Sequence, residues 1–150
     1  MNTSRFWLIR PATVEDSRGL SACMNAAFAT YQKRFGEDRL PPMDVDYRAE
    51  IAHYPVWVVE SGGIIVAGLI MVFTDDDASI ANIAVSPQHQ GRGIGGALMR
   101  LAEGAAVQRG YHELKLATHE LLDENLSLYR HLGWQESGRE SPRVFFKKPV

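Results

Sequence analysis

The N-terminal part of the chain has a short apolar run, followed by a segment in which apolar residues recur at regular intervals. Residues 6–9 are apolar up to Arg10-Pro11, and Thr13 with Asp16 has the Ser/Thr-x-x-acid spacing of a helix start. The apolar residues that follow recur at steps of three and four, so they share one helix face: Leu20, Cys23, Met24, Ala27, Phe28 and Tyr31. The pattern predicts a strand and then an amphipathic helix that packs on a core.

The middle of the chain has the residue types of antiparallel strands. A polar stretch at 33–42 predicts an exposed loop, and a short helix is expected over 44–53. The aspartates at 75–77 fit a turn better than a cation site, because acceptor-rich turns are common. β-Branched and aromatic runs between turn residues predict three strands, the first two of which form a hairpin: 55–60, 64–73 and 79–85.

The remaining part alternates helix and strand. Gly110 and Gly133 are placed where glycine commonly ends a helix. Apolar spacing and alternation predict the elements around them: a helix at 93–109, a strand at 113–117, a helix from its cap Asp123 through Leu132, and strands at 134–137 and 143–147.

Composition fits a single globular domain over residues 1–150. The 16 basic and 18 acidic residues are scattered and give a formal net charge of -2, so we expect neither a nucleic-acid nor a membrane partner. Cys23 is the only cysteine, which excludes an intrachain disulfide. No apolar segment has the length of a signal or transmembrane sequence, and we expect a cytoplasmic protein.

Glycines are concentrated between the predicted strand ending at Val85 and the helix that follows it. Glycine lets the backbone approach a ligand closely, and the first turn of a helix leaves N–H groups unpaired. An anion such as a diphosphate fits such a place better than a neutral group does, because the helix dipole and charge-assisted hydrogen bonds both favour negative charge. The glycines are Gly91, Gly93, Gly95 and Gly96.

Other interpretations of this glycine run differ in how well they fit. A P-loop needs Lys and Ser/Thr after its last glycine, whereas Gly95 is followed by Gly96-Ala97, which disfavours ATP or GTP hydrolysis. A dinucleotide fold places its glycines early, but this run follows antiparallel hairpins, although Glu113 lies near the expected acidic position. A glycine-rich turn that binds no ligand is a further alternative.

Two motifs lie in the second half of the chain. The first is a glycine motif that begins with glutamine and follows a strand ending in Ala84-Val85: Gln90-Gly91-Arg92-Gly93-Ile94-Gly95. The second is a tyrosine before an apolar residue, a glycine and an aromatic residue: Tyr129-Arg130-His131-Leu132-Gly133-Trp134. Together they resemble the signatures of the GNAT superfamily of acyl-CoA-dependent N-acyltransferases, and the order of predicted elements is similar as well. The resemblance implies an α+β fold: a mixed, mostly antiparallel sheet of six to seven strands, about four flanking helices, and a splay between the two central strands.

The resemblance implies acetyl-CoA as the acyl donor and no metal. Backbone groups of Ile83 and Val85 would pair with the pantetheine arm, and N–H groups of the glycine run would hold the pyrophosphate. Gln90 would support the loop, and Arg92 is either a phosphate ligand or a solvated side chain. The cofactor-binding residues expected in this way are Ile83, Ala84, Val85, Gln90, Gly91, Arg92, Gly93, Ile94, Gly95, Gly96 and Asn125.

By the same resemblance Tyr129 is the general acid that protonates the CoA sulfur as an amine attacks the thioester. Asn125 lies one turn earlier on the same face. The commoner family pattern has its asparagine seven residues before the tyrosine, where this chain has Leu122, so Asn125 either replaces that contact or serves the helix start. The base has no obvious family counterpart, and the candidates are His119, then Glu120, then an ordered water chain.

Two function classes are compatible with these motifs. An enzyme would transfer an acetyl group from acetyl-CoA to a primary amine of a small molecule or peptide, and Tyr129 favours this hypothesis. The alternative is a non-catalytic acetyl-CoA-binding sensor that has lost the base. No motif identifies the acceptor, and a homodimer is compatible with the sequence.

Overall fold

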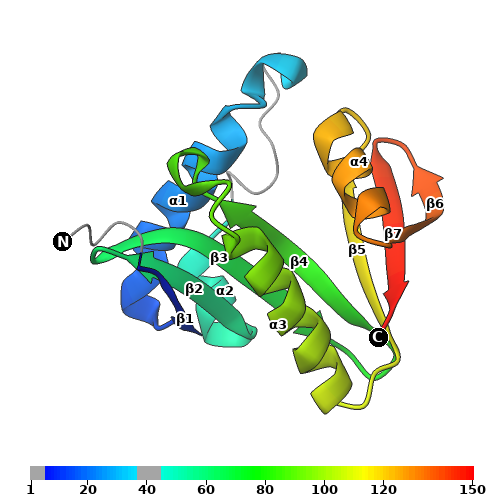
Figure 1. Ribbon diagram of the computed structural model, residues 1–150, viewed down its shortest axis with the longest axis horizontal. Helices are drawn as coiled ribbons and strands as arrows, with labels where there is room; N and C mark the ends of the chain where they lie inside the picture. Colours follow the sequence, from blue (N-terminus) through cyan, green and yellow to red (C-terminus); the bar gives the residue numbers. More distant parts are fainter. Residues whose placement is uncertain (1–5, 37–44) are drawn as a thin grey trace. The chain divides into compact units, whose positions relative to one another are not determined.

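The computed structural model describes residues 6–36 and 45–150. Within them the chain forms seven strands and four α-helices (Figure 1), and the strands follow the order β1-β2-β3-β4-β5-β7-β6 in the sheet. This is the predicted α+β fold. The elements are β1 Leu8–Pro11, α1 Ser17–Ala29, α2 Tyr47–His53, β2 Val56–Ser61, β3 Ile64–Phe73, β4 Ala78–Val85, α3 Ile94–Gln108, β5 Glu113–His119, α4 Asp123–His131, β6 Gln135–Glu140 and β7 Arg143–Pro149.

The chain divides into two compact units. The first consists of the described residues up to Met71 together with Asn82–Arg100, and the second of Val72–Ala81 together with Leu101–Val150. The glycine loop therefore belongs to the first unit, whereas Tyr129 belongs to the second.

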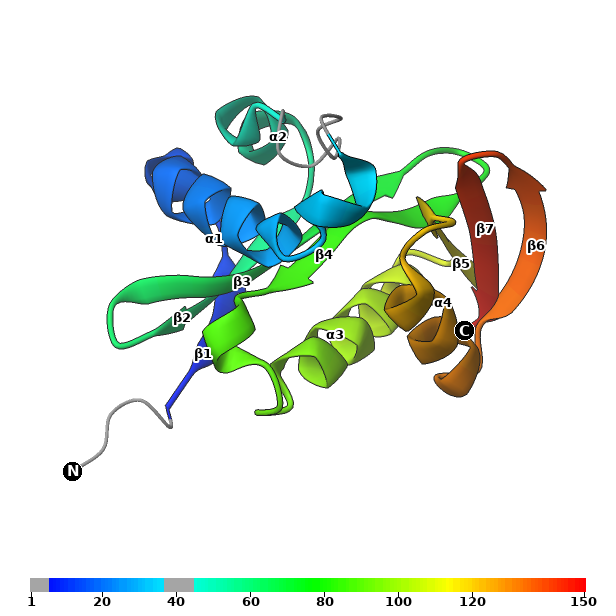
Figure 2. The same ribbon diagram turned by 90° about the horizontal axis from the view of Figure 1, so that it is seen from above.

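In the first unit, two helices cover one face of an antiparallel meander. β1 pairs with β2 and β2 with β3, and the turn between β2 and β3 contains Gly62 and Gly63 at φ 58° and 78°, as a tight hairpin turn requires. Leu20 and Met24 of α1 pack with Tyr47 of α2 against the buried residues of β2 and β3. Figure 2 shows α1 and α2 on the same side of these strands. The predicted amphipathic helix is thus confirmed.

In the second unit, β5 pairs antiparallel with β7, and β7 with β6. The start of β4 pairs in parallel with β5 at three positions only, from Ala78 opposite Leu114 to Ile80 opposite Leu116. A short parallel ladder of this kind fits the predicted splay of the two central strands. Helix α4 packs on these strands through Tyr129, whose ring centroid lies 5.7 Å from that of Phe146.

Several predicted boundaries shift. The first strand begins at Leu8 and includes Pro11, which is tolerated because β1 is an edge strand. The predicted loop at 33–42 begins as a 3₁₀ turn over Gln32–Phe35, and residues 37–44 lie outside the described part of the chain. Asp123 is not the cap of α4: the cap position is Leu122, and Asp123 lies in the first turn, where its charge favours the helix dipole.

The aspartate-rich segment forms the predicted turn. The N–H of Thr74 donates to the carbonyl oxygen of Asp77 at 2.8 Å, and the Asp77 carboxylate accepts from Lys115 Nζ at 2.6 Å.

Among the residues described here, no helix combines the length and the apolar character needed to cross a bilayer.

Candidate functional site

The glycine loop has an open backbone at the start of α3. Gly91 and Gly93 both have φ 81°, a conformation that residues with side chains rarely adopt, and a Cβ added at either would meet no atom within 4 Å. The helix begins directly afterwards at Ile94, whose side chain is buried and anchors the first turn. The loop therefore offers accessible backbone at a helix N-terminus, which suits an anion.

Side chains on both sides hold this loop in place. Gln90 Nε2 donates to the carbonyl oxygen of Val85 at 3.3 Å, which connects the loop to the end of β4. The first turn of α3 lies close to the end of β4, because a Cβ added at Gly95 would be only 3.8 Å from Val85 Cγ2. Arg92 is exposed, whereas the β4 residues expected to meet the pantetheine arm are half-buried: Ile83, Ala84 and Val85.

Tyr129 lies in the last full turn of α4 and its side chain is buried. Its ring meets that of Trp134 edge-on, with 6.0 Å between centroids, and also contacts Phe146 of β7. These two ring contacts hold the Tyr129 ring in place.

Asn125 connects α4 to β5. Its Nδ2 donates to Thr118 Oγ1 at 3.4 Å, and its position four residues before Tyr129 places both side chains on one helix face. The structure therefore brings Asn125, Tyr129 and the C-terminal end of β5 together within the second unit.

His119 and Glu120 stand at the end of β5 with their polar atoms engaged. His119 Nδ1 accepts from the backbone N–H of Leu121 at 3.1 Å. Glu120 Oε1 accepts from the Ser141 hydroxyl at 2.7 Å. His119 can accept a proton on Nδ1 only by giving up the Leu121 hydrogen bond.

The two faces of β5 carry different chemistry. Successive strand residues point to opposite faces, so Thr118 faces α4 with Asn125 and Tyr129, whereas His119 faces away from them. A phenol and an imidazole therefore lie on opposite faces of one strand.

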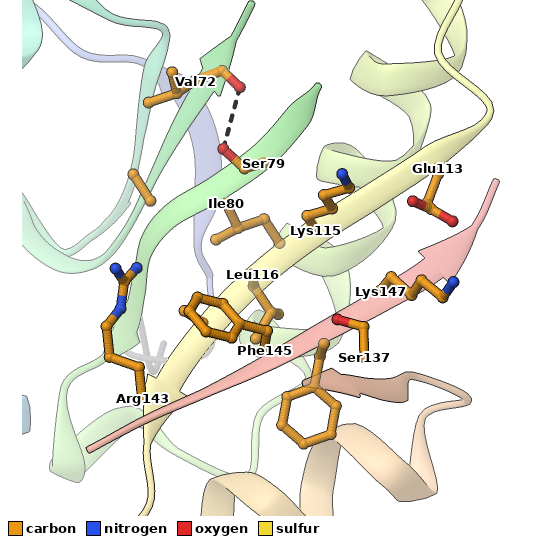
Figure 3. Close-up of a pocket in the computed structure, with 13 residues that line it drawn as sticks. Val72, Ser79, Ile80, Glu113, Lys115, Leu116, Ser137, Arg143, Phe145 and Lys147 are labelled. Carbon is orange, nitrogen blue, oxygen red and sulfur yellow. Dashed lines mark hydrogen bonds between the residues drawn. The ribbon is translucent and has the colours of Figure 1, made fainter. Parts of the chain in front are cut away.

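A cavity of about 700 Å³, which the sequence interpretation missed, lies against the face of β5 and β7 that carries Lys115, Phe145 and Lys147. Figure 3 shows Arg143, Phe145 and Lys147 along β7, with Lys115 on the neighbouring strand β5. The alternation of residues 143–147 is the signal that reveals this face, once β7 is known to pair with β5.

Polar groups also meet inside the first unit. Asn82 of β4 donates to the Tyr47 hydroxyl at 3.4 Å, and burial raises the pKa of Tyr47 above its usual value. Burial also raises the pKa of the Cys23 thiol to about 11, although a backbone hydrogen bond from Ser86 opposes this shift. Cys23 is therefore a packing residue with little thiolate at neutral pH.

Comparison with known proteins agrees with this architecture. The solved structure of PaiA N-acetyltransferase from Thermoplasma acidophilum in complex with coenzyme A superposes with a TM-score of 0.86, covering 97% of this chain and 99% of that one at 16% identity. A GNAT family acetyltransferase from Elizabethkingia anophelis with acetyl-CoA bound gives a TM-score of 0.66 at 15% identity and covers both chains completely. The fold is thus that of the acyl-CoA N-acyltransferases.

Sequence comparison identifies the family. Residues 21–134 match the Acetyltransferase (GNAT) family, so the chain belongs to this family of acyl-CoA-dependent N-acyltransferases. N-acetyltransferase family 8 member 2 from Rattus norvegicus is 33% identical over 93 residues, which is 58% of this chain and 41% of that protein. Family 8 member 3 from the same species is 35% identical over 114 residues, 64% of this chain and 50% of that protein. The chain spans half or less of the length of these curated relatives.

Proposed function

We propose that this chain transfers an acetyl group from acetyl-CoA to a primary amine of a small molecule or peptide. The observation that carries the proposal is the glycine loop: two glycines at φ 81° with open space above them, supported by Gln90, directly before a 15-residue helix. A pyrophosphate fits this backbone, because its charge meets unpaired N–H groups and the positive end of the helix dipole. Family membership and the CoA-bound structural neighbours support the same ligand.

The proposed assignment extends along β4. Backbone groups of Ile83 and Val85 pair with the pantetheine arm in the manner of an added strand, and Ala84 lies between them. The N–H groups from Gly91 to Gly96, including that of Ile94, surround the pyrophosphate, and the exposed Arg92 lies within the same loop.

Acetyl-CoA supplies the acetyl group as a thioester. The neutral amine of the acceptor forms a bond to the acetyl carbon, the bond from that carbon to sulfur breaks, and the electron pair leaves with the sulfur. Tyr129 donates its phenolic proton to that sulfur, and Asn125 holds α4 against β5 so that the phenol stays in position.

The proton lost by the amine needs an acceptor on the other face of β5. We assign this role to His119, which must exchange its hydrogen bond from Leu121 for one to the amine or to a bridging water. Glu120 is the weaker candidate, because Ser141 already donates to its carboxylate.

The test is release of free CoA thiol from acetyl-CoA in the presence of a panel of amines, with binding of acetyl-CoA measured by calorimetry in parallel. The proposed enzyme binds acetyl-CoA and releases thiol only with an amine that becomes acetylated. A protein that binds acetyl-CoA but acetylates no amine would be a sensor, and one that binds NAD or ATP in place of acetyl-CoA would overturn the assignment of the loop.

A further inference from the structure

The cavity over β5 and β7, here called the β5–β7 cavity, has the volume of a small-molecule site. It measures about 700 Å³ and lies entirely within the second unit. Its lining includes Phe145 of β7 and also the next residue, Phe146, whose ring contacts that of Tyr129. Arg143, which stands opposite His119 in the strand register, lines the cavity, whereas His119 itself does not.

Three of the four charged side chains that line this cavity are cationic. Lys115, Arg143 and Lys147 line it together with one carboxylate, that of Glu113 (Figure 3). Lys115 pairs with Asp77, but within the described residues neither Arg143 nor Lys147 has a carboxylate within ion-pair distance. Within the part of the chain that the structure describes, the cavity consequently offers two cations that form no ion pair with a carboxylate.

The strand register places like charges against each other. Lys115 of β5 stands directly opposite Lys147 of β7, and both side chains line the cavity. Like charges at directly opposed positions destabilise a sheet, and here Asp77 pairs with Lys115. The charge of Lys147 is then the one that a bound anion would pair with.

Arg143 is arranged to hold a carboxylate beside an apolar group. Its guanidinium lies over the ring of Phe145, 5.0 Å from the centroid, and the register sets Arg143 opposite His119. A guanidinium stacked on a ring keeps the N–H groups of its edge for a carboxylate, which it can bind through two parallel hydrogen bonds.

We propose that the β5–β7 cavity binds the acceptor, and that this acceptor is an amine that also carries a carboxylate. Arg143 binds the carboxylate, Lys147 adds positive potential, and Phe145 contacts the apolar part of the molecule. The inference rests on the proposed function, because it assigns the cavity to the amine side of that reaction. The same cations disfavour a polyamine, and a positive surrounding favours the neutral form of the amine, which is the form that attacks.

The experiment compares matched amines as acceptors: phenylalanine against phenylalaninamide, and glutamate against spermidine. Acetylation is followed by thiol release, and binding of each amine is measured by calorimetry. In the wild type we expect kcat/KM to be higher for phenylalanine than for phenylalaninamide, and higher for glutamate than for spermidine. Arg143→Gln should raise KM for phenylalanine about 10- to 100-fold, whereas KM for phenylalaninamide and the Kd of acetyl-CoA stay within about twofold. Arg143→Lys should give an intermediate KM, because lysine keeps the charge but loses the paired hydrogen bonds.

Arg139→Gln is the matched control, since Arg139 is an exposed cation of β6 that pairs with Glu136 and does not line the cavity. It should leave every KM unchanged. Acetylation of spermidine or phenylalaninamide in preference to the carboxylates would overturn the inference and leave the proposed function standing. Binding of phenylalanine that Arg143→Gln weakens, without any acetylation, would support the cavity assignment and overturn the proposed function.

Discussion

The substitution Gly93→Ala separates backbone strain from loss of a ligand site. Gly93 has φ 81°, and an added Cβ meets no atom within 4 Å, so strain of the left-handed conformation is the main cost to stability. That cost is about 1–2 kcal/mol in the free energy of unfolding. The methyl group would stand above the loop where we place the pyrophosphate. Loss of hydrogen bonds to a charged group is worth about 1.5–3 kcal/mol, which weakens binding of acetyl-CoA roughly 10- to 100-fold.

Gly63→Ala is a closely matched control. Gly63 has φ 78°, also has no atom within 4 Å of an added Cβ, and lies in the turn between β2 and β3. It should lower the free energy of unfolding by about the same amount as Gly93→Ala, yet leave the Kd of acetyl-CoA unchanged.

Urea unfolding gives the two stabilities, and calorimetric titration with acetyl-CoA at a temperature where both variants are folded gives the two affinities. The reasoning is refuted if both variants lose similar stability but Gly93→Ala binds acetyl-CoA as tightly as the wild type. In that case the backbone of the glycine loop does not hold the pyrophosphate.

Three further changes test other parts of the structure. Arg10 and the N–H of Thr13 lower the pKa of Asp16 from 3.8 to about 2. The ionised carboxylate therefore stabilises the fold above pH 3.8 and loses this effect as the pH falls towards 2. Asp16→Asn should lower the free energy of unfolding, measured in urea, by about 2 kcal/mol at pH 7 and by progressively less below pH 4. Gly68→Ala would place a Cβ against the Cδ1 atom of the buried Leu20, and we expect a loss of about 1–3 kcal/mol in the free energy of unfolding, whereas a smaller loss would show that the Leu20 side chain or α1 can shift. His119→Gln should slow acetyl transfer by about 10²-fold without changing the Kd of acetyl-CoA, and an unchanged rate would exclude His119 as the base and leave Glu120 or water.

Most of the secondary structure could be predicted because its signals are local. The apolar spacing of α1, the glycines of the β2–β3 turn and the helix stop at Gly133 each act within a few residues. Element ends were less predictable, since they depend on packing. Leu122 takes the cap position of α4 while its side chain is buried, and Asp123 is displaced into the first turn.

The candidate site likewise has parts that local sequence motifs predict and parts that they do not. The glycine loop and Tyr129 were found because each stands in a contiguous motif. The β5–β7 cavity was missed because it depends on pairing between strands that are distant in sequence. Residues 143–147 alone look like an ordinary strand with polar outward positions, and the opposition of Lys115 to Lys147 appears only with the register of β5 and β7. The hydrogen bond to His119 Nδ1 comes from a backbone conformation that the sequence does not reveal.

Single-turnover acetyl transfer by Tyr129→Phe tests the central claim most directly, with the Kd of acetyl-CoA measured on the same preparation. Phenylalanine keeps the ring contacts with Trp134 and Phe146 and removes only the hydroxyl. The variant should bind acetyl-CoA as the wild type does and transfer the acetyl group to an amine about 10²–10⁴-fold more slowly. Transfer at the wild-type rate would contradict the role of Tyr129 as the proton donor.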